Sequence, residues 1–354
     1  MYPEIEIRVE NIIQNAHLMR DICKKNGKSL SLVTKCLVSD KEVVERLVQS
    51  GVDTICEAHL KNLKDYDGIN AEKWLIREPM ISEAEDVVRY AEVSLNSEPK
   101  TIMALDAEAK KQGKIHKVIL MYELGDLREG ADKSELESLT KLCLSLDNIC
   151  LYGIGVNLSC YGAVMPDIDN MNELSLVAKS LEDKFGIELA VISGGNSTSF
   201  EMLTRGELPQ NINNLRMGEA VFFGNMPCVE RPIEGFSRDN FVLRAQIVEI
   251  KDKPSVPRGN RGLWDALGEP PPVYEDKGIR KRALVAIGKQ DVNPDGLTPL
   301  DSGITILGGS SDYTILDITE SKESYEVGDV VEFDTSYGAL LRIMSSKYVN
   351  RVYK

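Results

Sequence analysis

The chain has 354 residues, with 56 acidic and 42 basic side chains and a formal net charge of −14. This acidic balance argues against nucleic acid or an anionic membrane as a partner, because both favour a surplus of Lys and Arg. No stretch approaches the ~18 consecutive apolar residues of a membrane span, and the first residues lack the layout of a signal peptide, so we expect a cytoplasmic protein.

The cysteines and histidines form no pattern typical of a metal site or a disulfide framework. The three histidines are isolated in the sequence, and no two cysteines form a C-x-x-C pair. We therefore expect reduced thiols and no bound metal. The seven cysteines lie at positions 23, 36, 56, 143, 150, 160 and 228.

Strand candidates alternate with polar helical segments along the first two thirds of the chain. Strict alternation of strand and helix implies right-handed crossovers and a parallel sheet, and eight such units are the count of a TIM-type (β/α)8 barrel. We assign this α/β barrel to residues 11–230. The strand candidates are residues 30–35, 52–58, 74–77, 93–95, 117–125, 151–158, 190–193 and 215–224, and the helical segments include 40–50, 82–90, 134–147 and 172–185.

After residue 230 the pattern changes to frequent Pro and Gly, with strand candidates that follow one another directly. This predicts a second, all-β domain over residues 231–354. Ile5, Ile7 and Val9 alternate at the start of the chain, so we expect residues 1–10 to add a strand to that β domain. Its other strand candidates are residues 240–251, 282–287, 304–307, 313–318 and 329–333.

Lys35 closes the first strand candidate of the barrel and is followed by a change to loop and helix. In such barrels the active site lies at the C-terminal ends of the strands. A partly desolvated lysine amine at that position can attack a carbonyl carbon. The alternative is an ordinary solvated lysine at a strand end.

The segment Ser193–Thr198 follows the seventh strand candidate and combines two glycines with an amide and three hydroxyl groups. Glycine lets backbone N–H groups approach an anion, and barrels often bind phosphate after strands seven and eight. The alternative is a turn that caps the next helix. Arg128 and Arg216 sit at strand ends of the same barrel mouth, and together with this segment they indicate an anionic or electron-rich ligand, although either could be a surface arginine.

A lysine amine, a phosphate loop and arginines at one barrel mouth specify a phosphorylated aldehyde cofactor, and pyridoxal 5'-phosphate is the obvious one. Here the chain resembles the alanine-racemase-like, fold-type III pyridoxal-phosphate enzymes, and among them it is most similar to the ornithine racemase group. The matching segments are Val33–Cys36, Glu123–Gly130, Gly155–Gly162, Ser193–Thr198, Leu215–Glu219, Lys253–Pro257, Ala286–Asp291, Gly308–Asp312 and Ser336–Arg342.

The resemblance implies roles for individual residues around the cofactor and the substrate. Lys35 would carry the cofactor covalently and act as one catalytic base, while Arg216 would face the pyridine nitrogen. The phosphate would be bound by the loop residues Ser193, Asn196, Ser197 and Thr198, with backbone donors at Gly218 and Glu219. Arg128 would lie near the phenolic oxygen of the cofactor, and Asn157 near its ring. The substrate carboxylate would be bound by Ser311 and Asp312, which the partner subunit of a homodimer would supply.

Racemisation needs two acid–base groups on opposite faces of the α-carbon, and the second one is open. Alanine racemases use a tyrosine of the second domain, but the corresponding residues 254–266 contain no tyrosine. The candidates are Asp265, Cys160, Tyr161 and Tyr337. A cationic substrate side chain would also need a carboxylate partner, for which Asp265, Asp312 and Glu219 are available.

The leading hypothesis is an amino acid racemase that interconverts L- and D-ornithine. Racemisation of lysine, arginine or alanine is the nearest alternative. A decarboxylase or a D-amino acid lyase would use the same scaffold and cofactor. A third class is a non-catalytic protein that only binds pyridoxal phosphate, which the second domain argues against.

Overall fold

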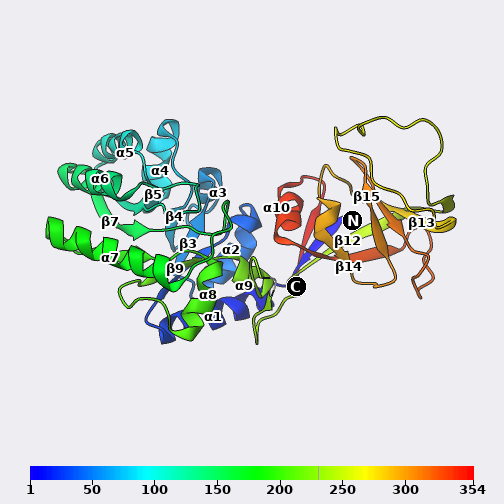
Figure 1. The fold of residues 1–354 in the computed structure, drawn as a ribbon, viewed down its shortest axis with the longest axis horizontal. Coiled ribbons are helices and arrows are strands. Elements are labelled where there is room, and N and C mark those ends of the chain that lie inside the picture. The colour runs from blue at the N-terminus through cyan, green and yellow to red at the C-terminus, as the bar shows by residue number, and fades with distance from the viewer. Residues whose placement is uncertain (230) are drawn as a thin grey trace. The chain divides into compact units, whose positions relative to one another are not determined.

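The computed structural model describes residues 1–229 and 231–354, which divide into two compact units. The barrel unit comprises Glu10–Arg238. The β unit combines Met1–Val9 with Asp239–Lys354. Figure 1 shows the helices and strands of each unit.

Eight parallel strands close into a barrel in the barrel unit, as the sequence predicts. Each strand pairs with the next one in the chain, and the ring closes where β2 pairs with β9. The strands are β2 (Ser29–Val33), β3 (Thr54–Glu57), β4 (Glu72–Leu75), β5 (Val93–Asn96), β6 (His116–Met121), β7 (Ile149–Gly155), β8 (Val191–Ser193) and β9 (Asn214–Met217).

Helices connect the barrel strands, and local capping fixes where several of them begin. Asp132 and Asp167 form capping boxes at the starts of α6 and α7, in which each carboxylate accepts from backbone N–H groups. The helices are α1 (Val9–Lys25), α2 (Lys41–Gln49), α3 (Leu60–Asp65), α4 (Ala84–Tyr90), α5 (Pro99–Gln112), α6 (Lys133–Ser145), α7 (Ile168–Phe185), α8 (Phe200–Arg205) and α9 (Glu219–Phe223), with 3-10 turns η1 (Lys35–Leu37), η2 (Ile81–Glu83) and η3 (Ser197–Ser199).

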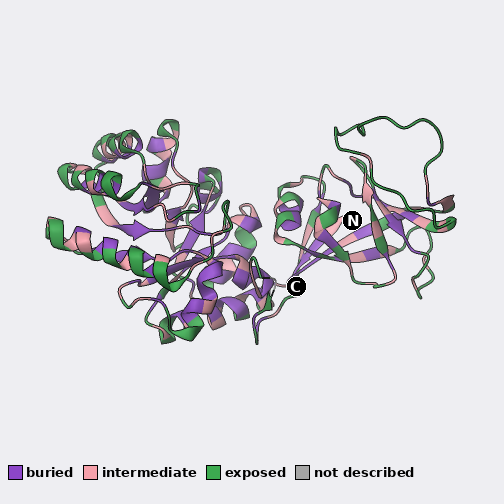
Figure 2. Cartoon of the chain, viewed as in Figure 1, coloured by how far each residue is buried: buried purple, intermediate pink, exposed green. Residues whose placement is uncertain are grey.

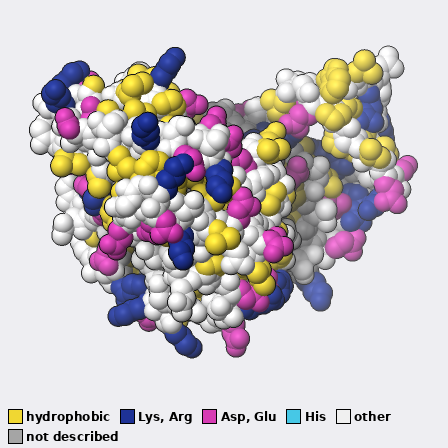
Figure 3. Space-filling view, turned by 60° about the vertical axis from the view of Figure 1, so that its left-hand side comes forward, with side chains coloured by type: hydrophobic (Ala, Val, Ile, Leu, Met, Phe, Trp, Pro, Cys, Tyr) yellow, Lys and Arg dark blue, Asp and Glu magenta, His cyan; other side chains and the backbone are white. Residues whose placement is uncertain are grey.

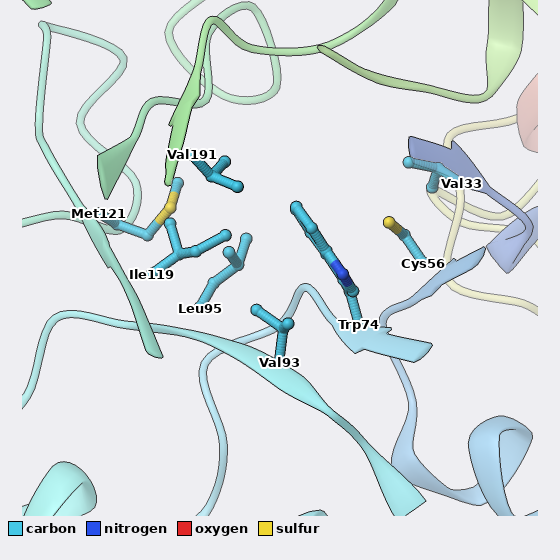
Figure 4. Packing of buried hydrophobic residues seen from close by; sticks show 8 residues of the cluster. All are labelled: Val33, Cys56, Trp74, Val93, Leu95, Ile119, Met121 and Val191. Atoms are coloured by element: carbon cyan, nitrogen blue, oxygen red, sulfur yellow. The ribbon is translucent and has the colours of Figure 1, made fainter. Parts of the chain in front are cut away.

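Apolar side chains from several strands meet inside the barrel (Figure 4). Each such side chain that leaves water stabilises the fold by roughly 1.5–3 kcal/mol. Successive side chains on a strand alternate between its two faces, so the neighbours of these inward residues face the surrounding helices. The cluster contains Val33, Cys56, Trp74, Val93, Leu95, Ile119, Met121 and Val191.

The strand predicted over residues 215–224 is wrong in its second half. The strand β9 ends at Met217, and the helix α9 follows from Glu219. The chain turns at Gly218, where an added Cβ would lie 2.7 Å from the carbonyl oxygen of Val33. A short, fully apolar run carries no periodicity that separates a buried strand from a buried helix.

The β unit is built on an eight-stranded sheet. The strand β1 pairs antiparallel with β12 and parallel with β18. A helix that the sequence analysis did not predict, α10 (Tyr337–Ser345), begins where Ser336 accepts from the N–H of Ala339. The strands are β1 (Glu4–Ile7), β12 (Phe241–Pro254), β13 (Ile279–Val285), β14 (Leu297–Pro299), β15 (Thr305–Gly309), β16 (Thr314–Asp317), β17 (Val330–Thr335) and β18 (Asn350–Tyr353), with the turn η4 (Pro294–Gly296).

Burial and charge follow the usual pattern of a folded domain. The barrel strands are mostly buried, whereas the helices expose one side, and the connection between β12 and β13 is exposed along most of its length (Figure 2). Basic and acidic side chains are interspersed on the face shown in Figure 3. Among the described residues, no helix is both long and apolar enough to cross a membrane.

Candidate active site

Lys35 lies at the C-terminal end of β2, where it opens the 3-10 turn η1 and is half-buried. The turn ends at Val38, whose N–H donates to the carbonyl oxygen of Lys35 at 3.3 Å. Val38 and Ser39 both adopt left-handed backbone conformations, with φ of 46° and 55°. The lysine is therefore presented at the barrel mouth by a tight and unusual turn.

The hydroxyl oxygen of Ser197 accepts hydrogen bonds from backbone N–H groups that follow the next strand. Its Oγ accepts from the N–H of Gly218 at 3.2 Å and from the N–H of Ala220 at 3.1 Å. The loop after β8 and the start of α9 are thus in direct contact, as expected if they share one phosphate. A side chain at Gly218 would collide with Val33, so the close approach of this backbone requires glycine.

Asn196 connects the loop after β8 with the loop after β7. Its Oδ1 accepts from the N–H and the hydroxyl of Thr198 at 2.9 and 2.8 Å, and its Nδ2 donates to the carbonyl oxygen of Leu158 at 2.8 Å. Asn196 Nδ2 also donates to Oδ1 of Asn157 at 3.2 Å. The buried Nδ2 of Asn157 has no hydrogen-bond partner among the described residues, which leaves a donor for an acceptor on a bound ligand.

Arg216 on β9 is buried inside the barrel, where its guanidinium donates to the hydroxyl of Ser193 and to the carbonyl oxygen of Val156. Burial lowers the pKa of this guanidinium from its ordinary value. Gly155 makes room for the group, because an added Cβ would lie 3.2 Å from Arg216 Nη1. Ser193 in turn donates to Asn214 at 2.7 Å. The arginine is therefore held by two neutral partners, one on β8 and one directly after β7.

The loop after β6 carries Arg128, which is exposed and forms an ion pair with Glu129. The sequence analysis gave no role to Asp126 of the same loop. Its side chain is buried and accepts from three consecutive backbone N–H groups of the next loop, those of residues 160–162, at 3.0–3.1 Å. Asp126 thereby ties together two loops that hold candidate residues. Asp126 lies in the segment Glu123–Gly130, which the sequence analysis singled out, but the sequence does not reveal the backbone groups that it binds.

The remaining candidates divide between the two units. Cys160 and Tyr161 are exposed on the loop after β7, and Glu219 opens α9 beside Lys35. Burial raises the pKa of Glu219, and the charge of Lys35 acts in the opposite direction. The candidates in the β unit are Asp265, Ser311, Asp312 and Tyr337.

Chemically, the barrel mouth combines a primary amine with neutral donors suited to an anion. Backbone N–H groups at a strand end and the start of a helix, together with a serine hydroxyl, match the needs of a phosphate. The unpartnered amide of Asn157 and the donors of Arg216 suit the polar edge of an aromatic ring. The residues present therefore fit pyridoxal phosphate.

A family model described as the alanine racemase N-terminal domain matches residues 7–226. The chain belongs to this family. The match begins at the last residue of β1 and covers nearly the whole barrel unit, including every barrel residue discussed above.

Two curated relatives extend the similarity over the full chain. The ornithine racemase of Acetoanaerobium sticklandii is 44% identical over 352 residues, which cover 99% of both chains. The lysine racemase of Thermotoga maritima is 34% identical over 356 residues, covering 100% of this chain and 99% of the relative.

Solved structures of alanine racemases share the fold. The enzyme from Streptomyces lavendulae has a TM-score of 0.78 at 17% identity, covering 99% of this chain and 96% of that one. The enzyme from Bartonella henselae, solved with covalently bound pyridoxal phosphate, has a TM-score of 0.72 at 18% identity and covers 99% of both chains. At this identity the likeness establishes the architecture only.

Proposed function

We propose that the protein is a pyridoxal-phosphate-dependent amino acid racemase that interconverts L- and D-ornithine. The observation that carries this proposal is the position of Lys35 at the same barrel mouth as the Ser197 loop and the buried Arg216. The choice of ornithine is supported by the 44% identity to a relative with that activity over nearly the whole chain.

The cofactor, when bound, supplies an electron sink that makes the α-proton of an amino acid acidic. Lys35 would hold the cofactor and then move a proton on one face of the α-carbon. Ser197 and the N–H of Gly218 would bind the phosphate. Arg216 would direct a donor at the pyridine nitrogen and, because a guanidinium has no acceptor, would take no proton from the ring.

The second base is open between Asp265, Cys160, Tyr161 and Tyr337. Deuterium exchange at the α-carbon, measured for each enantiomer separately, distinguishes them. A variant that loses exchange from one enantiomer and keeps it from the other has lost one of the two bases. For the substrate, we propose that Ser311 and Asp312 lie near its carboxylate. Its side-chain ammonium would lie near Asp265, Asp312 or Glu219.

We further propose that the protein works in the cytoplasm as a homodimer whose subunits share their active sites. The loop between β12 and β13 exposes large apolar side chains, with Leu263 84% and Trp264 64% accessible. Exposed apolar groups of this size are typical of surfaces that meet another protein. Light scattering of the full-length protein would measure the mass directly.

One assay tests the reaction and the substrate together. The protein is loaded with pyridoxal phosphate, incubated with single enantiomers of ornithine, lysine, arginine and alanine, and the products are separated by chiral chromatography. We expect the opposite enantiomer to accumulate fastest from ornithine. Amine or keto acid products would instead indicate a decarboxylase or a lyase, and no turnover would indicate a binding protein.

A further inference from the structure

Glu57, the last residue of β3, is fully buried and is held by three side chains from two other segments of the barrel unit, the end of β2 and the helix α3 with its C-cap. Thr34 Oγ1 donates to its Oε1 at 2.7 Å, Asn62 Nδ2 to its Oε2 at 2.9 Å, and the hydroxyl of Tyr66 to its Oε1 at 3.3 Å. Burial raises the pKa of this carboxyl group to about 7. Because burying a carboxyl is costly, its set of partners calls for a reason beyond packing.

One of these partners, Thr34, directly precedes Lys35. Thr34 is fully buried, and its backbone N–H donates to the carbonyl oxygen of Cys56 at 3.0 Å. The residue before it, Val33, faces the barrel interior (Figure 4), so the side chain of Thr34 is anchored on the outer face of the strand. Backbone and side chain together fix the peptide from which the lysine extends.

The turn that follows stores backbone strain. Val38 and Ser39 are consecutive non-glycine residues in the left-handed region, and such conformations cost about 1–3 kcal/mol each. Beyond them, the buried Asp40 caps α2 by accepting from the N–H of Val43 at 3.1 Å. The strained turn is thus held by a buried carboxyl group at each end.

We propose that Glu57 is a positioning residue for Lys35 and acts through the hydroxyl of Thr34. Without this anchor, the strained turn can relax at its strand end and the amine moves away from the ligand. This inference rests on the proposed function, because it assumes that Lys35 carries the cofactor. A displacement of about 1 Å at a reacting group can cost up to ~100-fold in rate.

The test targets the link between the two residues from both sides, because the hydroxyl of Thr34 also lies 3.4 Å from the carbonyl oxygen of Cys56. T34V deletes the hydroxyl at nearly constant volume, T34S restores it, and E57Q weakens the acceptor. Each full-length variant is loaded with pyridoxal phosphate. The measurements are the absorption spectrum across pH, the rate of cofactor release into hydroxylamine, the site of phosphopyridoxyl after borohydride reduction, the urea midpoint, and kcat and KM for the racemisation of ornithine. T140V is the matched control, because Thr140 is also fully buried and donates to Leu136 in α6.

We expect T34V to release the cofactor about tenfold faster and to lower kcat by a similar factor with little change in KM. T34S should recover the rate of the original protein, and E57Q should lie between T34V and the original. T140V should lower the urea midpoint without changing the spectrum or the release rate. This pattern separates positioning from a loss of stability.

Two results would overturn the inference alone. One is a T34V protein with the original spectrum and release rate, and the other is a T140V protein that releases cofactor as fast as T34V. If the unsubstituted protein carries no label on Lys35, the proposed function itself fails and the inference falls with it.

Discussion

In the barrel unit, Arg216, Asn196 and Ser197, unlike Arg128, bind partners that are distant in the sequence. In the β unit, Asp265, Ser311 and Asp312 bind near neighbours in the sequence. Arg216 donates to Val156, 60 positions away. Asp265 instead accepts from the N–H groups of Leu267 and Glu269 in its own exposed loop. This difference supports our proposal that residues of the barrel hold the cofactor, while exposed loops of the β unit contribute to the choice of substrate.

The largest effect on activity is expected when the amine of Lys35 is removed from the barrel unit. K35A should lower racemisation about 10⁴-fold, because it deletes the cofactor attachment and one acid–base group. Chiral chromatography measures the loss. K41A, which removes an exposed lysine of α2, is the control and should keep its rate. A K35A protein with a tenth of the original rate would contradict the assignment.

The buried hydrogen-bond network around Glu57 makes the free energy of unfolding depend on pH. Burial raises the pKa of Glu57 from 4.5 to about 7, so between these values the folded protein keeps a proton that the unfolded chain has released. Raising the pH through this window therefore destabilises the folded state, by about 3 kcal/mol in total. Urea unfolding should show a smaller decline from pH 4.5 to pH 7 in E57Q. Equal slopes in both proteins would refute this.

Removing the hydroxyl of Ser197 should weaken cofactor binding. S197A removes a hydroxyl that would donate to the phosphate and whose oxygen holds the N–H groups of Gly218 and Ala220. The loss of a hydrogen bond to a charged group costs about 1.5–3 kcal/mol. Equilibrium dialysis with pyridoxal phosphate should show an increase of about 10- to 100-fold in Kd. S138A removes an exposed serine hydroxyl of α6 and should bind as the original protein does. Unchanged affinity in S197A would place the phosphate elsewhere.

A smaller effect on turnover is expected from a substitution that only adds volume beside Arg216. In G155A the new methyl group would press on Arg216 Nη1 and on Cβ of Ser193, at 3.2 and 3.3 Å. Overpacking of this kind typically costs 1–3 kcal/mol, and here it should shift the absorption band of the bound cofactor and slow turnover about tenfold. G338A in α10 meets no atom within 4 Å and is the control. An unshifted band in G155A would show that the arginine can move freely.

The smallest effect on the cofactor should come from the β unit. D265N keeps an acceptor oxygen for the turn at residues 265–269 and should leave the Kd for pyridoxal phosphate unchanged. Its influence should appear only in substrate turnover. If D265N weakens cofactor binding as much as S197A does, the division of labour between the two units is wrong.

Much of the barrel could be predicted because its pattern is repetitive. All eight strands lie where apolar runs alternate with polar helices. The failures have local causes. The buried run of residues 220–223 is helical rather than extended, and α10 was missed although Ser336 is a typical helix N-cap.

The site was predictable where residue type and strand end coincide, as for Lys35, Ser197 and Arg216. It was not predictable where a role depends on which residues the fold brings into contact. Glu57 looks like an ordinary acid near the end of a strand, and only the structure brings it to Thr34 and Tyr66. Asp126 likewise gains its meaning from backbone groups of a different loop.

The closure of the ring through β2 and β9 has a consequence for folding. Ser31 pairs with Arg216 and Leu32 with Met217, so the strand that leads to Lys35 can pair with β9 only after the rest of the barrel has been synthesised. Contacts this distant in sequence form slowly, because a long loop must close first. A ligand that needs both strands stabilises only the closed ring. Under our proposal, in which the cofactor contacts Lys35 and Arg216, its uptake therefore requires a barrel that is fully synthesised and folded.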